Sequence, residues 1–208
     1  MFAPQRKILI GKVSTSEDEI RDIIKAWVLV SVAFGIVLNE GRLFTSSFFS
    51  SFAMAFLTVG IGFLLHELAH KLVAQRYGCF AEFRAFDQFL FLAVLMSFFG
   101  VVFAAPGAVF ITGPVGVKRN GKISVAGPIT NIAIALIFFA LWFLASESSW
   151  ITKMAYYGFY INSWLALFNM LPFWNFDGSK IWPWNKTVYI CVTATAAILM
   201  FMLNFIKA

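Results

Sequence analysis

The sequence predicts an all-α polytopic membrane protein with about five to six transmembrane helices. Hydrophobic residues make up 61% of its 208 residues and charged residues only 12%, so the chain is too apolar for a soluble domain of this length. The apolar residues form long uncharged runs, and about 20 such residues in a helix cross the hydrocarbon core of a bilayer. The seven tryptophans and 26 phenylalanines suit a lipid-facing surface with interfacial belts. The length corresponds to a single domain, residues 1–208.

The expected spans follow one another with short polar segments between them. Ser16 and Glu19 form a predicted capping box, with Ser16 as the N-cap and Glu19 reaching back, which opens a helix with a short first span at residues 23–38. The other uncharged runs are 43–65, 88–117, 123–146, 154–176 and 187–206. Prolines and glycines interrupt residues 88–117, so we expect a helix followed by re-entrant or extended structure there. A six-span arrangement, in which this run crosses the membrane, is the alternative.

The basic residues predict the orientation of these spans. With a cytoplasmic N-terminal segment, residues 1–22, only Arg42, Lys153 and Lys207 of the 16 Lys and Arg residues fall on the outer side. The basic stretch around residue 120 then lies inside, and its Asn-Gly dipeptide predicts a β-hairpin over residues 115–125. Because basic residues flank the apolar runs, the net charge of +6 reflects membrane orientation, and we expect no nucleic acid partner.

The only two histidines of the chain, His66 and His70, stand four residues apart with Glu67 directly after the first. On an α-helix, residues i and i+4 share a face, so both imidazoles can reach one ion. Catalytic zinc takes three protein ligands and a water, and a glutamate at this position can accept the proton of that water as it attacks a carbonyl. A helix that merely carries two histidines is the alternative, but ionisable groups next to a membrane span rarely lack a role. We predict one bound Zn²⁺.

The best candidate for the third zinc ligand is Asp177. The run 154–176 returns to the cytoplasmic side in the predicted orientation, so this carboxylate arrives at the depth of the two histidines. An interfacial acid that caps a turn is the alternative reading. The two cysteines, Cys79 and Cys191, lie far apart and match no paired metal pattern, so we expect free thiols.

Three blocks of sequence between residues 61 and 178, the expected catalytic core, form a more specific pattern. The first is His-Glu-Leu-Ala-His at residues 66–70. The second, residues 169–178, has the form Asn-x-x-Pro-x-x-x-x-Asp-Gly, and the third, residues 124–131, contains a Gly-Pro-x-x-Asn helix start. Together they resemble the site-2 proteases, a family of intramembrane zinc metalloproteases. Trp174 and Phe176 replace a proline and a leucine often found in that family, which should alter the shape of the cleft and leave the metal chemistry intact.

The resemblance implies a role for each residue of the site. His66, His70 and Asp177 would bind zinc, and Glu67 would be the general base. Asn169 would hold the substrate or stabilise the oxyanion, a task for which an amide in a dry cleft is suited. An interhelical hydrogen bond is an equally weighted alternative for Asn169, and for Asn131 we expect such a structural role.

The predicted function is hydrolysis of a peptide bond within or near a transmembrane segment of another membrane protein. The partners would be that transmembrane protein or peptide and the lipid bilayer, with the active site opening to the cytoplasm. Because a helical substrate must unwind, the predicted hairpin or a strand near residues 109–111 could supply an edge for it. A membrane metal transporter or sensor with the same ligands is the alternative function, but few polar residues mark a path across the bilayer. A catalytically silent scaffold related to the proteases is a third hypothesis.

Overall fold

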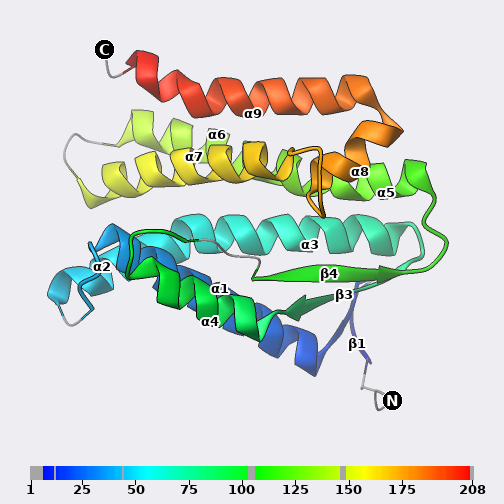
Figure 1. Ribbon diagram of the computed structural model, residues 1–208, viewed down its shortest axis with the longest axis horizontal. Coiled ribbons are helices and arrows are strands. Elements are labelled where there is room, and N and C mark those ends of the chain that lie inside the picture. The colour runs from blue at the N-terminus through cyan, green and yellow to red at the C-terminus, as the bar shows by residue number, and fades with distance from the viewer. Residues whose placement is uncertain (1–6, 12, 44, 103–105, 146–148, 207–208) are drawn as a thin grey trace. The chain divides into compact units, whose positions relative to one another are not determined.

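The computed structural model describes residues 7–11, 13–43, 45–102, 106–145 and 149–206 (Figure 1). The chain divides into two compact units. Unit 1 comprises Met1–Phe56 and Lys71–Pro114, and unit 2 comprises Leu57–His70 and Val115–Ala208. Lys207 and the first six residues of the predicted cytoplasmic segment lie outside the described residues.

Unit 1 combines helices with two pairs of short strands. Its helices are α1 (Glu17–Leu38), α2 (Ser46–Ala55) and α4 (Asp87–Ser97). Its antiparallel strand pairs are β1 (Lys7–Ile10) with β2 (Val13–Ser16), and β3 (Phe80–Ala85) with β4 (Gly107–Thr112). Helix α1 packs against α2, α4 and β3. The fold is therefore mainly helical but not all-α, and the helix-then-strand order of α4 and β4 confirms that residues 88–117 form no continuous helix.

Unit 2 is a set of packed helices. They are α5 (Val117–Ser124), α6 (Ala126–Leu144), α7 (Trp150–Asn169), α8 (Asp177–Trp184) and α9 (Lys186–Ile206). Helices α6, α7 and α9 pack on one another around buried Ala135, Phe159 and Leu199, and α5 packs on α8 (Figure 1). A π-helical turn, Phe56–Gly60, and helix α3 (Ile61–Arg76) continue from α2, and α3 contributes residues to both units.

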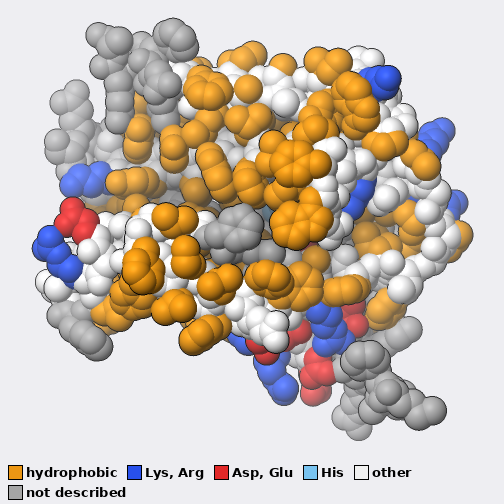
Figure 2. Space-filling model, viewed as in Figure 1, with side chains coloured by type: hydrophobic (Ala, Val, Ile, Leu, Met, Phe, Trp, Pro, Cys, Tyr) orange, Lys and Arg blue, Asp and Glu red, His pale blue; other side chains and the backbone are white. Residues whose placement is uncertain are grey.

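Two helical segments of the described chain are long and apolar enough to cross a membrane. They are Ser46–Arg76, with 31 residues, and Val117–Leu144, with 28 residues. The expectation of five to six spans is not supported, because α1 begins with a cluster of charged residues and α7 mixes its apolar residues with polar ones. The apolar helices Asp87–Ser97 and Lys186–Met202 are shorter. Figure 2 nevertheless shows hydrophobic side chains over much of the face in view.

The prediction of a β-hairpin over residues 115–125 is wrong. The segment forms helix α5, which begins after Gly116. Gly121, the second residue of the presumed turn dipeptide, is buried, and a Cβ atom there would lie 2.4 Å from Cβ of Trp184. The glycine therefore serves the close packing of α5 on α8, and this tertiary contact overrides the local turn preference. The predicted strand near residues 109–111 is present as β4.

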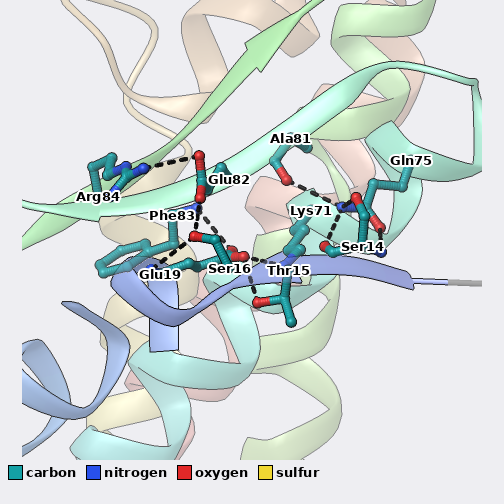
Figure 3. Close-up of polar contacts among 10 residues, drawn as sticks. All are labelled: Ser14, Thr15, Ser16, Glu19, Lys71, Gln75, Ala81, Glu82, Phe83 and Arg84. Atoms are coloured by element: carbon teal, nitrogen blue, oxygen red, sulfur yellow. Dashed lines mark hydrogen bonds and ion pairs between the residues drawn. The ribbon is translucent and has the colours of Figure 1, made fainter. Parts of the chain in front are cut away.

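The start of α1 belongs to a buried polar cluster in unit 1 (Figure 3). Ser16 caps the helix as predicted, since its Oγ accepts a hydrogen bond from the backbone N–H of Glu19 at 3.1 Å. The Glu19 side chain does not reach back to the cap. It is fully buried, lies 2.5 Å from Nζ of Lys71, and accepts hydrogen bonds from the hydroxyl of Thr15 at 2.7 Å and the backbone N–H of Phe83 at 2.9 Å.

A second set of contacts extends this cluster along the last turns of α3. The side-chain amide of Gln75 donates to the backbone carbonyls of Ser14 at 2.8 Å and Ala81 at 3.1 Å, and its oxygen accepts from the backbone N–H of Ser14 at 3.1 Å. Lys71 and Gln75, one helical turn apart, thus attach the end of α3 to β2, α1 and β3 within unit 1 (Figure 3).

Candidate metal centre

Helix α3 holds the two histidines of the predicted motif on one face. His66 and His70 are buried, and their Nε2 atoms lie 3.0 Å apart. The ring planes are nearly perpendicular, at 88°. The i, i+4 spacing therefore brings the two nitrogens together as predicted.

Asp177 reaches the histidines from the first position of α8. Its Oδ2 lies 3.2 Å from Nε2 of His66 and 3.2 Å from Nε2 of His70. The turn before α8 is tight, since a Cβ atom on Gly178 would lie 2.2 Å from the carbonyl oxygen of Met170. The Asp-Gly pair is therefore required sterically: only glycine lets the chain fold back closely enough to place the carboxylate beside the two rings.

The other nitrogen of each ring faces a hydrogen-bond acceptor. Nδ1 of His70 lies 2.9 Å from the carbonyl oxygen of Ile123, and Nδ1 of His66 lies 2.6 Å from Oδ1 of Asn131. Because a carbonyl oxygen can only accept, each Nδ1 carries the proton, and each Nε2 presents a lone pair. Metal-binding histidines commonly have this arrangement, with the second nitrogen donating to a carbonyl or carboxylate.

Three lone-pair atoms thus converge in a buried place. His66, His70 and Asp177 form a group whose ligand atoms all lie within 4.8 Å of one another. Oδ2 of Asp177 is buried and has no hydrogen-bond donor among the described residues. Such an arrangement is repulsive unless a cation lies between the atoms. The donor set of two imidazoles and one carboxylate is that of a catalytic zinc site, which keeps its fourth position for water.

The region next to the ligand atoms is kept free of side chains. Gly127, near the start of α6, is buried, and a Cβ atom there would lie 2.5 Å from Nε2 of His66 and 2.6 Å from Cε1 of His70. Any larger residue would occupy the space in which the ligands meet. The residues present therefore fit a bound metal ion.

Burial opposes ionisation of the Asp177 carboxyl, but the electrostatic attraction of His70 and His66 outweighs burial. Together they hold the pKa of Asp177 well below its usual range. The carboxylate is consequently ionised at neutral pH and able to bind a metal.

The two other predicted site residues lie on the same elements. Glu67 follows His66 on α3, is partly buried, and interacts electrostatically with His70. Asn169 is the last residue of α7, and its Nδ2 donates to the carbonyl oxygen of Leu165 at 2.9 Å, one turn earlier in the same helix. Their assigned roles as base and substrate-binding amide stay predictions.

Sequence reasoning did not foresee the contact between Asn131 and His66. We expected Asn131 to join helices, and it does so, but its Oδ1 also faces a predicted metal ligand. The available signal was an asparagine one helical turn after Gly127 in an otherwise uncharged run. Nothing in the sequence indicates that the carbonyl of Ile123 would orient the second histidine.

A relative in a methanogen decides the family. The chain is 43% identical over 143 residues to a protein of Methanocaldococcus jannaschii named "Putative zinc metalloprotease MJ0611", and the match covers 68% of this chain and 75% of the relative. The chain belongs to this family of zinc metalloproteases. No protein-family model and no solved structure matches the sequence. The relative and the buried group His66, His70 and Asp177 agree on the predicted cofactor, one zinc ion.

Proposed function

We propose that this zinc metalloprotease is of the site-2 type and hydrolyses a peptide bond within or near a transmembrane segment of another membrane protein. The observation that carries the proposal is the position of the metal ligands. His66 and His70 lie within Ser46–Arg76, a helical segment of 31 residues that is long and apolar enough to cross a membrane.

The exposed surface of unit 2 supports a lipid environment. The second apolar segment, Val117–Leu144, exposes Ile137, Phe143 and Leu144 at 67%, 73% and 85% of their surface. Large hydrophobic side chains with this exposure are costly in water, and they suit contact with acyl chains. Helix α6, the longer part of this segment, carries Gly127 and Asn131 beside the histidines, so the apolar helix also forms part of the site.

Each residue of the site then has a chemical task. His66, His70 and Asp177 would hold a zinc ion, which would lower the pKa of a bound water and polarise the substrate carbonyl. Glu67 accepts the proton of the attacking water and passes it to the leaving amine. Asn169 directs its amide to the substrate, for which Nδ2 must leave the carbonyl of Leu165.

The remaining expectations complete the proposal. The N-terminus and the opening of the active site face the cytoplasm, as the distribution of Lys and Arg indicates. The substrate unwinds near its cleavage point, because a helix hides the scissile carbonyl. Strand β4 pairs with β3 alone among the described residues and offers an edge to an extended peptide.

The test uses purified protein in liposomes with a panel of single-span peptides. Wild type is expected to cleave at least one peptide in or next to its apolar stretch, and Glu67→Gln is expected to bind zinc but to cleave none. A soluble, unstructured peptide with the same scissile sequence is the control for membrane specificity. Full activity of Glu67→Gln would contradict the mechanism. Zinc flux into the vesicles without cleavage of any peptide would favour a transporter.

A further inference from the structure

The amide of Asn131 connects three helices of unit 2 at a fully buried position. Its Nδ2 donates to the carbonyl oxygen of Gly62 on α3 at 3.2 Å and to Oδ1 of Asn162 on α7 at 3.0 Å. Its Oδ1 lies 2.6 Å from Nδ1 of His66. Asn131 and Asn162 are both fully buried. Every polar atom of the Asn131 side chain therefore has a partner, and one of these partners is a metal ligand.

The network determines which way the amide points. Asn162 donates from its own Nδ2 to the carbonyl oxygen of Gly158 at 2.9 Å, so its Oδ1 is left facing Asn131. Asn131 must then present Nδ2 to two oxygens and Oδ1 to His66. A flipped amide would set N–H against N–H and oxygen against oxygen in the protein interior, where an unmade hydrogen bond costs about 1–3 kcal/mol.

Gly62 makes room for this network. A Cβ atom at this position would lie 2.2 Å from Oδ1 of Asn162, so any side chain on this turn of α3 would displace the amide. Gly62 and His66 are one helical turn apart on the same helix, and Asn131 contacts both. A helix-joining role alone is fulfilled by the bonds to Gly62 and Asn162 and does not require the contact with the ring.

We propose that Asn131 is a positioning residue that keeps the His66 ring in its Nδ1–H form and aims Nε2 at the metal. The hydrogen bonds to Asn162 and Gly62 hold the Asn131 amide in one orientation, and Oδ1 of that amide then holds the orientation of the His66 ring. His70 is held differently, because its Nδ1–H donates to the backbone carbonyl of Ile123, which no side-chain substitution removes. The orientation of the first ligand therefore depends on one replaceable side chain.

This inference rests on the zinc site and not on intramembrane cleavage, so metal binding is the measurement. Asn131→Leu removes the acceptor at nearly constant volume. Asn131→Asp keeps an acceptor facing His66 but leaves the carbonyl of Gly62 and Oδ1 of Asn162 without their donor, so it should lower stability. We expect zinc affinity to fall about 10–100-fold in Asn131→Leu, as is typical when the partner of a ligating histidine is lost. We expect Asn131→Asp to recover most of that loss. The visible spectrum of the Co²⁺-loaded protein should shift in Asn131→Leu and return towards wild type in Asn131→Asp.

The matched control is Ser163→Ala on α7. Ser163 is as deeply buried as Asn131, and its hydroxyl donates to the carbonyl oxygen of Phe159 in its own helix at 2.8 Å. Its loss should lower stability without changing zinc affinity or the Co²⁺ spectrum. Wild-type zinc affinity in a folded Asn131→Leu variant, or equal losses in Asn131→Leu and Asn131→Asp, would overturn the proposal.

A measurement on the wild type decides the matter if Asn131→Leu does not fold. The chain has only two histidines, so ¹⁵N-histidine labelling gives two ring spin systems, and a His70→Gln sample assigns them. We expect the His66 ring in the zinc-loaded protein to carry its proton on Nδ1 and to bind metal through Nε2. Metal binding through Nδ1 of His66, or a mixture of the two forms, would refute the proposal whether or not the protein cleaves peptides.

Discussion

Gly127→Ala should remove the zinc from the protein. The added Cβ would lie 2.5 Å from Cε1 and Nε2 of His66, whereas ordinary van der Waals contacts of a Cβ begin at 3.4 Å. The His66 ring or the helix start must therefore move by about 0.9 Å, the difference between these distances. Zinc–nitrogen distances in a functional site hold to roughly 0.2 Å. The required displacement is several times this tolerance.

The start of α6 cannot easily move away. Gly127 and the following Pro128 are buried, and alanine is about 1 kcal/mol more favourable than glycine inside a helix, so α6 itself is not weakened. The rings must absorb the displacement. We expect zinc affinity to fall at least as far as it does when the partner of a ligating histidine is lost, which is about 10–100-fold.

The assay is the zinc content of the purified protein after dialysis against a metal buffer, together with its thermal unfolding. Gly158→Ala is the matched control, because its Cβ would lie 2.5 Å from Cγ of Phe138, an equally close approach to a ring that is not a ligand. This control should lose thermal stability but keep one zinc per chain. A folded Gly127→Ala protein with wild-type zinc affinity would show that the three ligand atoms do not hold the metal where the structure brings them together.

Three further predictions concern stability. Replacing Glu19 by Ala leaves Lys71 buried without its carboxylate and should lower the free energy of unfolding by about 3–5 kcal/mol in denaturant titrations. The double variant Glu19→Leu with Lys71→Met, which removes both charges, should recover most of the lost free energy. A variant as stable as wild type after Glu19→Ala would contradict the buried pair. A chelator should lower the midpoint of thermal unfolding, and added zinc should restore it in wild type but not in Asp177→Ala, because only the folded state gathers the ligands. The hydrogen bond from Lys25 to Asp87 raises the pKa of Lys25, although desolvation opposes the increase. The ion pair therefore contributes its full stability below pH 10.5, the ordinary pKa of lysine. This contribution is lost as the pH rises through the higher pKa of the folded state. Lys25→Met should flatten that alkaline loss in a pH series, and an unchanged pH profile would argue against the pair.

The meeting of His66, His70 and Asp177 in one group was predictable because two different signals in the sequence point to it. The spacing of His66 and His70 is a local property of a helix, and Asp177 is the acidic residue that ends a long uncharged run. Residue spacing and the length of an uncharged run can both be read directly from a sequence.

Several long-range contacts of the fold were not predictable from such signals. Glu19 fits a capping box locally, yet it pairs with Lys71, 52 residues away, because both must be buried together. Gly121 stands in a turn dipeptide, yet the packing of Trp184 places it in a helix. The hydrogen-bond partners of Asn131 on α6 lie on α3 and α7, so they meet only when these three helices are packed together. In each case a distant residue decides the outcome, and local preference carries no information about it.

The separation of the ligands along the chain also sets the time at which the site can exist. His66 and His70 emerge early in synthesis, whereas Asp177 follows more than a hundred residues later and needs the turn at Gly178 to reach them. A nascent chain that ends before α8 offers two imidazoles, which hold zinc weakly and lack the buried charge. In the proposed mechanism, hydrolysis therefore requires that α5–α8 have been made and packed, and a chain that ends before α8 should not cleave peptides.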